Sequence, residues 1–119
     1  MAKILIVDDS RTSRKILRGI LEDANHEIVG EAVNGEDGVA MFEKLNPDIV
    51  TLDITMPIMD GVTALKEILG KDRTAKVIMV TAAGQQTNVV EALKIGAIEF
   101  VSKPFDKDVI LDVIGKALS

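Results

Sequence analysis

Short apolar runs rich in β-branched residues alternate along the chain with segments of helical periodicity. The runs are typical of buried strands and cover residues 3–8, 27–32, 48–53, 76–82 and 98–103. Apolar residues spaced three and four positions apart predict helices over residues 11–24, 35–45, 62–70, 86–96 and 106–118. This alternation predicts an α/β domain whose parallel sheet is covered by helices on both faces.

The helical segments also indicate their ends and their buried faces. Ser10 is the expected N-cap of the first helix, and Gly70 and Gly96 are expected to end the third and fourth helices as C-cap glycines. The apolar positions that share one face are Ile16, Leu17, Ile20 and Leu21 in the first helix, and Val109, Ile110, Val113, Ile114 and Leu118 in the last.

Composition narrows the class of protein. The chain has 119 residues, of which 47% are hydrophobic, and we expect a single domain over residues 1–119. A net charge of −5 without a basic block disfavours nucleic acid and anionic membranes as partners. Cysteine is absent, which excludes disulfides and thiolate chemistry. With no secretory or membrane-spanning pattern, we expect a cytoplasmic protein, and we expect it to be a monomer.

Polar side chains follow four of the five predicted strands. They are Asp8–Asp9, Asp53, Thr81 and Lys103, whereas the second strand ends near Glu31 and offers no comparable group. Alone, each has an ordinary explanation as a turn acid, a strand threonine or a solvated lysine. The carboxyl ends of parallel strands meet at one edge of the sheet, so these explanations do not account for the set.

The chemistry of this set is that of phosphoryl transfer. Three carboxylates from two strand ends make an oxygen-rich site that suits Mg²⁺. Asp53 stands alone on the predicted central strand, which makes it the best candidate nucleophile toward phosphorus, and Asp8 and Asp9 are then metal ligands. Lys103 would supply positive charge to the phosphoryl oxygens, and the Thr81 hydroxyl would donate a hydrogen bond to one of them.

The motifs VDD, LDITMPIMDG, VTA and SKPF, in this order, resemble the receiver domain of two-component response regulators over the full chain. The resemblance implies a flavodoxin-like, doubly wound, five-stranded parallel sheet of order 2-1-3-4-5 with five helices. It also implies that Asp53 is the phosphoacceptor, which receives its phosphoryl group from the phosphohistidine of a histidine kinase. Mg²⁺ would be held by Asp8, Asp9, Asp53 and the backbone carbonyl of Thr55.

The same resemblance implies a conformational switch. Thr81 and Phe100 match the family's switch pair, and Lys103 matches its phosphate-contacting lysine, followed by a cis bond to Pro104. Many relatives carry Tyr where this chain has Phe100. The output face would lie on residues 85–95, 98–103 and 106–118, with Val89, Val90 and Lys94 as candidate contacts, although Val89 and Val90 fit core positions equally well. Such a protein is not an enzyme in the usual sense, since it catalyses only its own phosphorylation and slow dephosphorylation.

The local sequence over residues 81–105, including GQQ at 84–86, most resembles chemotaxis regulators of the CheY type. This implies a CheA-like sensor histidine kinase as phosphodonor and a flagellar motor switch protein as target. A phosphorelay carrier and a receiver cut from a larger transcription regulator remain alternatives.

Other classes fit less well. A haloacid dehalogenase-like phosphatase uses a similar set, but its nucleophile would precede the acidic pair, and Thr55 stands where its second Asp is needed. A P-loop is disfavoured because Glu36 and Asp37 replace the required Lys and Ser/Thr. A degenerate receiver that serves only for docking is disfavoured because no chemical group is missing. His26 is expected to be an exposed bystander.

Overall fold

The computed structural model describes all 119 residues as five parallel strands that alternate with five helices. The strands are β1 (Lys3–Val7), β2 (Glu27–Ala32), β3 (Ile49–Asp53), β4 (Val77–Thr81) and β5 (Glu99–Ser102). The helices are α1 (Arg11–Asp23), α2 (Gly35–Leu45), α3 (Gly61–Lys71), α4 (Gln86–Ile95) and α5 (Lys107–Leu118). The sheet order is β2-β1-β3-β4-β5, as the resemblance implied.

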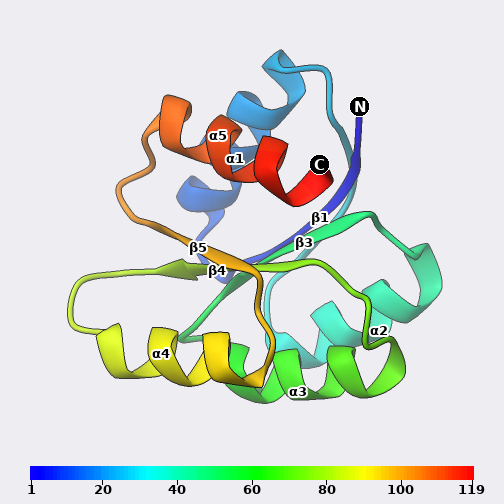
Figure 1. Ribbon diagram of the computed structural model, residues 1–119, viewed down its shortest axis with the longest axis vertical. Helices are drawn as coiled ribbons and strands as arrows, with labels where there is room; N and C mark the ends of the chain where they lie inside the picture. The colour runs from blue at the N-terminus through cyan, green and yellow to red at the C-terminus, as the bar shows by residue number, and fades with distance from the viewer.

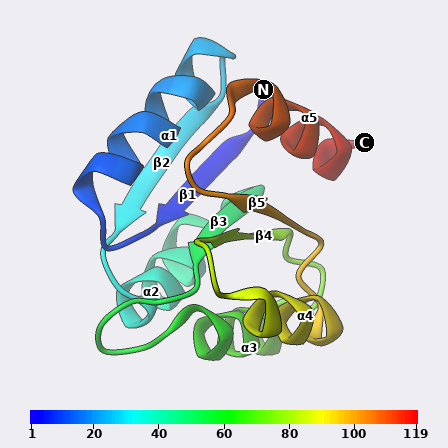
Figure 2. The ribbon, with the colours of Figure 1, turned by 90° about the vertical axis from the view of Figure 1, so that its left-hand side faces the viewer.

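Helices cover both faces of the sheet. Helices α1 and α5 pack on one face, and α2, α3 and α4 pack on the other (Figures 1 and 2). Strands β1, β3 and β4 have partners on both sides, and their residues are almost entirely buried. That burial explains why the sequence of these strands is a continuous apolar run rather than an alternating one.

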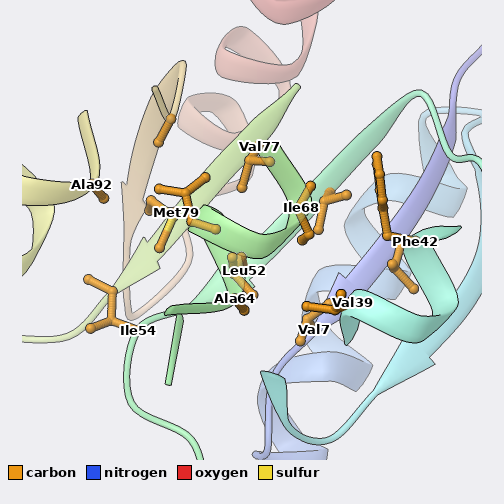
Figure 3. Packing of buried hydrophobic residues seen from close by; sticks show 14 of the residues in the cluster. Val7, Val39, Phe42, Leu52, Ile54, Ala64, Ile68, Val77, Met79 and Ala92 are labelled. Carbon is orange, nitrogen blue, oxygen red and sulfur yellow. The ribbon is translucent and has the colours of Figure 1, made fainter. Parts of the chain in front are cut away.

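Each face of the sheet has its own hydrophobic core. The larger core lies under α2, α3 and α4 and includes Leu52, Ile68 and Met79 (Figure 3). The smaller core lies under α1 and α5 and includes Leu17, Leu21 and Ile114. With three phenylalanines and no tryptophan or tyrosine in the chain, both cores are filled mainly by aliphatic side chains.

The predicted helix faces are partly correct. Leu17 and Leu21 of α1, and Ile110, Val113 and Ile114 of α5, are buried as expected, and Ile20 is partly buried. Ile16 and Val109 are instead about half exposed, and Leu118 is also exposed. Each of these two helices rests on one sheet face, so only a narrow stripe of each is covered, and apolar positions at its margin remain in contact with water.

Two of the three predicted helix caps are confirmed. The Ser10 side chain accepts a hydrogen bond from Ser13 N at 3.2 Å, and α4 ends at Gly96, whose φ is +138°. The prediction that Gly70 ends α3 is wrong, because the helix continues to Lys71 and its C-cap is Asp72. A glycine with a φ that helices allow need not stop a helix, and Asp72 instead caps the turn that follows by accepting from Thr74 N.

The start of α3 lies very close to the end of β3. Gly61 N donates to the Ile54 carbonyl at 2.7 Å, and a Cβ added at Gly61 would lie 2.0 Å from the Asp53 carbonyl oxygen. Asp60 caps the helix by accepting from Thr63 N at 2.8 Å. Glycine at position 61 is therefore required for α3 to pack against the backbone that carries Asp53. None of the five helices has the length and hydropathy needed to cross a bilayer.

Candidate functional site at the carboxyl edge of the sheet

Three carboxylates gather where β1 and β3 end. Asp8, Asp9 and Asp53 each place a carboxylate oxygen within 4.8 Å of the others. Asp8 and Asp53 are buried, whereas Asp9 is exposed. Asp8 Oδ1 accepts from Ser10 N at 2.8 Å, and Asp53 Oδ1 accepts from Ile54 N at 3.0 Å, so main-chain donors orient both buried carboxylates. The predicted convergence of these three acids is confirmed as geometry.

Lys103 brings positive charge to the same place from the end of β5. Its Nζ lies 3.0 Å from Asp8 Oδ2 and 3.4 Å from Asp53 Oδ2. The expected cis peptide bond joins Lys103 to Pro104. One ammonium and three carboxylates leave an excess of two negative charges in the cluster, and oxygen donors with this excess suit a hard divalent cation.

The electrostatic state of the cluster follows from burial and like charge. Desolvation, and then the neighbouring charge of Asp8, raise the pKa of Asp53 to about 6, although Lys103 opposes the rise. Burial lowers the pKa of Lys103, but its hydrogen bond to Asp8 and the charge of Asp53 outweigh burial and leave it raised. Lys103 therefore stays protonated. Asp53 is the group whose charged form the site disfavours.

Thr81 lies at the end of β4, next to this cluster in the sheet, and is buried. Its hydroxyl lies 3.1 Å from the Ala82 carbonyl oxygen and 3.3 Å from Gln85 Oε1. Beside it is a cavity of about 420 Å³, lined by Thr81, Val89, Leu93, Phe100 and Lys103 among others. Phe100 is 39% exposed, so it is not a fully buried core residue.

The end of β2 contributes to the site indirectly. The Glu31 carboxylate turns toward α1, where it pairs with Arg14 at 3.0 Å and also with Arg18. Arg14 Nη1 in turn donates to the carbonyl oxygen of Asp8 at 2.8 Å. Glu31 therefore fixes an arginine that supports the backbone of the site. The sequence offered one sign of this arrangement, the spacing of Arg14 and Arg18 along one face of α1.

The structure corrects the expectation for His26 and decides between the two alternatives for Val89. His26 is partly buried rather than exposed, and its Nδ1 accepts from Ala2 N at 3.1 Å, so it anchors the start of β1. Burial lowers its pKa, and the N-terminal amine adds to this. Val89 is buried, which makes it a core residue rather than a surface contact, whereas Val90 is 52% exposed.

Comparison with known proteins gives one consistent family. A family model for the response regulator receiver domain matches residues 4–115. The chemotaxis protein CheY of Listeria monocytogenes is 50% identical over 117 residues, which cover 98% of each chain. CheY of Thermotoga maritima is 46% identical over 114 residues, covering 96% of this chain and 95% of the relative.

Among solved structures, a chain of the CheX–CheY–BeF₃–Mg²⁺ complex from Borrelia burgdorferi superposes with a TM-score of 0.93. It is 39% identical, and the match covers 98% of this chain and 89% of that one. The fold, over nearly the full length of the chain, is therefore shared with chemotaxis proteins.

Proposed function

The chain belongs to the response regulator receiver domain family of two-component signalling, with chemotaxis homologues, and on this premise we propose that Asp53 accepts a phosphoryl group from the phosphohistidine of a sensor histidine kinase. A carboxylate oxygen of Asp53 attacks phosphorus, the P–N bond breaks, and its electron pair returns to the imidazole. The observation that carries this proposal is the position of Lys103 Nζ, within 3.4 Å of both buried carboxylates.

The chain's own residues would bind Mg²⁺ through Asp8, Asp9, Asp53 and the main-chain carbonyl of Thr55. Receiver domains bind this ion at their acidic pocket, and the two excess negative charges here support the same assignment. When bound, the ion would neutralise charge on the transferred phosphoryl group. Lys103 would contact a phosphoryl oxygen on Asp53, since its ammonium already lies within 3.4 Å of Asp8 and Asp53.

The signal would leave the site through Thr81 and Phe100. The Thr81 hydroxyl donates a hydrogen bond to an oxygen of the new phosphoryl group, and the Phe100 ring turns inward into the cavity beside Thr81. The surface formed by α4, β5 and α5 then changes shape. This surface already exposes Val90, Leu93, Ile98, Phe100 and Val109, which supports an apolar protein partner.

The target we propose is a flagellar motor switch protein, with a CheA-like kinase as donor. Chemotaxis relatives at 46% and 50% identity support this choice, and the Borrelia structure is that of a CheY in complex with another protein, CheX. The protein is a signalling molecule rather than a classical enzyme. We propose that it acts in the cytoplasm as a single receiver domain and that it is monomeric before phosphorylation.

The test is binding of a labelled N-terminal peptide of the flagellar switch protein, with and without Mg²⁺ and beryllofluoride. Wild type should bind more tightly only when both are present, and Asp53→Asn should abolish the increase. Asp23→Asn is the matched control, because Asp23 is an exposed carboxylate at the end of α1. If beryllofluoride binds but the peptide does not, the target is wrong and the phosphorelay role is favoured. If beryllofluoride fails to bind, the phosphoacceptor assignment is wrong.

A further inference from the structure

The side chain of Gln85 links two loops at the carboxyl edge of the sheet. Its Nε2 donates to Thr55 Oγ1 at 2.7 Å, and its Oε1 accepts from Ala82 N at 2.7 Å. Since a main-chain N–H can only donate, the atom that faces Ala82 is the amide oxygen, and this fixes the orientation of the amide. Gln85 thus joins the loop after β4 to the loop after β3, two residues beyond Asp53.

The Gln85 side-chain oxygen is also an acceptor for the Thr81 hydroxyl. Both oxygens near Thr81 Oγ1, those of Ala82 and of the Gln85 side chain, are acceptors at 3.1 and 3.3 Å. A threonine hydroxyl has one proton to donate, so this proton is directed toward the β4–α4 loop. In this arrangement Thr81 is occupied by Gln85 and its neighbour rather than by a group at Asp53.

The use of this side chain is unusual within the molecule. The other four helices are capped by side chains of Ser10, Asn34, Asp60 and Asp106. Gln85 occupies the N-cap position of α4 but makes no capping hydrogen bond. The preceding residue, Gly84, has φ +87°, so the chain turns back on itself and presents the Gln85 amide to Ala82 and Thr55. The amide therefore holds the two loops together and leaves α4 without a side-chain cap.

We propose that Gln85 is a positioning residue that holds the β3–α3 and β4–α4 loops together in the unphosphorylated protein. It must release Thr81 when Asp53 is phosphorylated. This inference rests on the proposed function, since it assumes that Thr81 turns to the phosphoryl group. Phosphorylation then competes with two acceptors in the β4–α4 loop, Gln85 Oε1 and the carbonyl of Ala82, whose N–H Gln85 holds. The Thr81 hydroxyl has one proton and cannot serve these acceptors and the phosphoryl group together. Removing the bridge should therefore favour the phosphorylated arrangement by about the net contribution of one hydrogen bond, roughly a five-fold change in affinity.

The experiment is a calorimetric titration of Mg²⁺-loaded protein with beryllofluoride. Gln85→Ala should bind roughly five-fold more tightly than wild type. Asn88→Ala is the matched control, because it also removes a side-chain amide, at an exposed position of α4 that does not line the cavity beside Thr81. Equal or weaker binding by Gln85→Ala, or the same gain in Asn88→Ala, overturns the proposal.

A second variant separates the bridge from a general loosening of the loop. Thr55→Val removes the acceptor of the Gln85 Nε2 proton at nearly constant side-chain shape and should also tighten binding. Combined with Gln85→Ala, it should add little, since both changes break one bridge. Additive gains overturn the proposal. If Gln85→Ala does not fold, the sign of the Thr55→Val effect decides alone.

The titration also distinguishes this proposal from the one on which it rests. Wild type that fails to bind beryllofluoride overturns both the phosphoacceptor assignment and the role of Gln85. Wild type that binds beryllofluoride, with no difference among the variants, overturns only the role of Gln85.

Discussion

Asp53 is a buried carboxylate whose negative charge faces that of Asp8. Burial and the Asp8 charge raise the pKa of Asp53 to about 6 in the folded protein, above its usual value of 3.8. A raised carboxyl pKa means that the folded state binds this proton more tightly than the unfolded state does. The contribution of Asp53 to stability is therefore greatest below about pH 4 and is lost as pH rises through about 6.

Asp53→Asn should accordingly stabilise the Mg²⁺-free protein at neutral pH. The amide has no charge to desolvate, and the expected gain is about 1–2 kcal/mol after allowance for the water that reaches this edge. Urea unfolding at several pH values measures it. The advantage over wild type should grow from pH 4 to pH 7, and an advantage that is constant with pH would contradict the electrostatic explanation.

At the residue scale, the sequence predicted which side chains meet at the site better than it predicted the hydrogen bonds that connect them. The convergence of Asp8, Asp53 and Lys103 follows from strand ends that share one edge, which is a property of parallel sheets. The bridge from Gln85 to Thr55 does not follow from any such rule. It joins loops 30 residues apart and depends on the turn at Gly84, and no periodicity encodes that geometry.

At the scale of elements, the strand and helix boundaries lie close to those predicted. The β2 and α2 bounds are the same, and the other ends differ by one residue each where they differ. Strong alternation of apolar runs with helical segments explains this agreement. The exposure of Ile16 and Val109 was not predicted, because the apolar face of a helix is visible in the sequence but the width of its contact with the sheet is not.

The junction of β3 with α3 gives a test at this scale. Gly61→Ala places a Cβ 2.0 Å from the Asp53 carbonyl oxygen, so the helix or the strand end must move. We expect a loss of roughly 1–3 kcal/mol in the free energy of unfolding, together with weaker Mg²⁺ binding. Chemical denaturation and a Mg²⁺ titration measure the two effects.

The matched control for Gly61→Ala is Gly70→Ala in the same helix. A Cβ at Gly70 meets nothing within 4 Å. Because alanine is the better helix former, this variant should gain about 0.5–1 kcal/mol and bind Mg²⁺ like wild type. A similar loss in both variants would show that the close approach at Gly61 is not the cause.

For the whole molecule, the acidic cluster links ion binding to stability. An ion that binds only the folded state stabilises it, by about 2.7 kcal/mol at a hundred times its dissociation constant. For a chain of this size, the melting temperature should rise by about 10 °C on addition of Mg²⁺ and fall again with chelator. Sodium chloride at equal ionic strength is the control. A shift that persists in Asp8→Asn would place the ion elsewhere.

The site draws its groups from residues as far apart in the sequence as Asp8 and Lys103, and it joins them only where β1, β3 and β5 reach the same edge. β5 pairs only with β4, so Lys103 meets the two acids only after the outer strand of the sheet has been added. Any chemistry that needs all three groups is thus confined to chains in which β1, β3, β4 and β5 have assembled. A nascent or partly unfolded copy without β5 in place would not accept a phosphoryl group, so phosphorylation would itself report that these strands have come together.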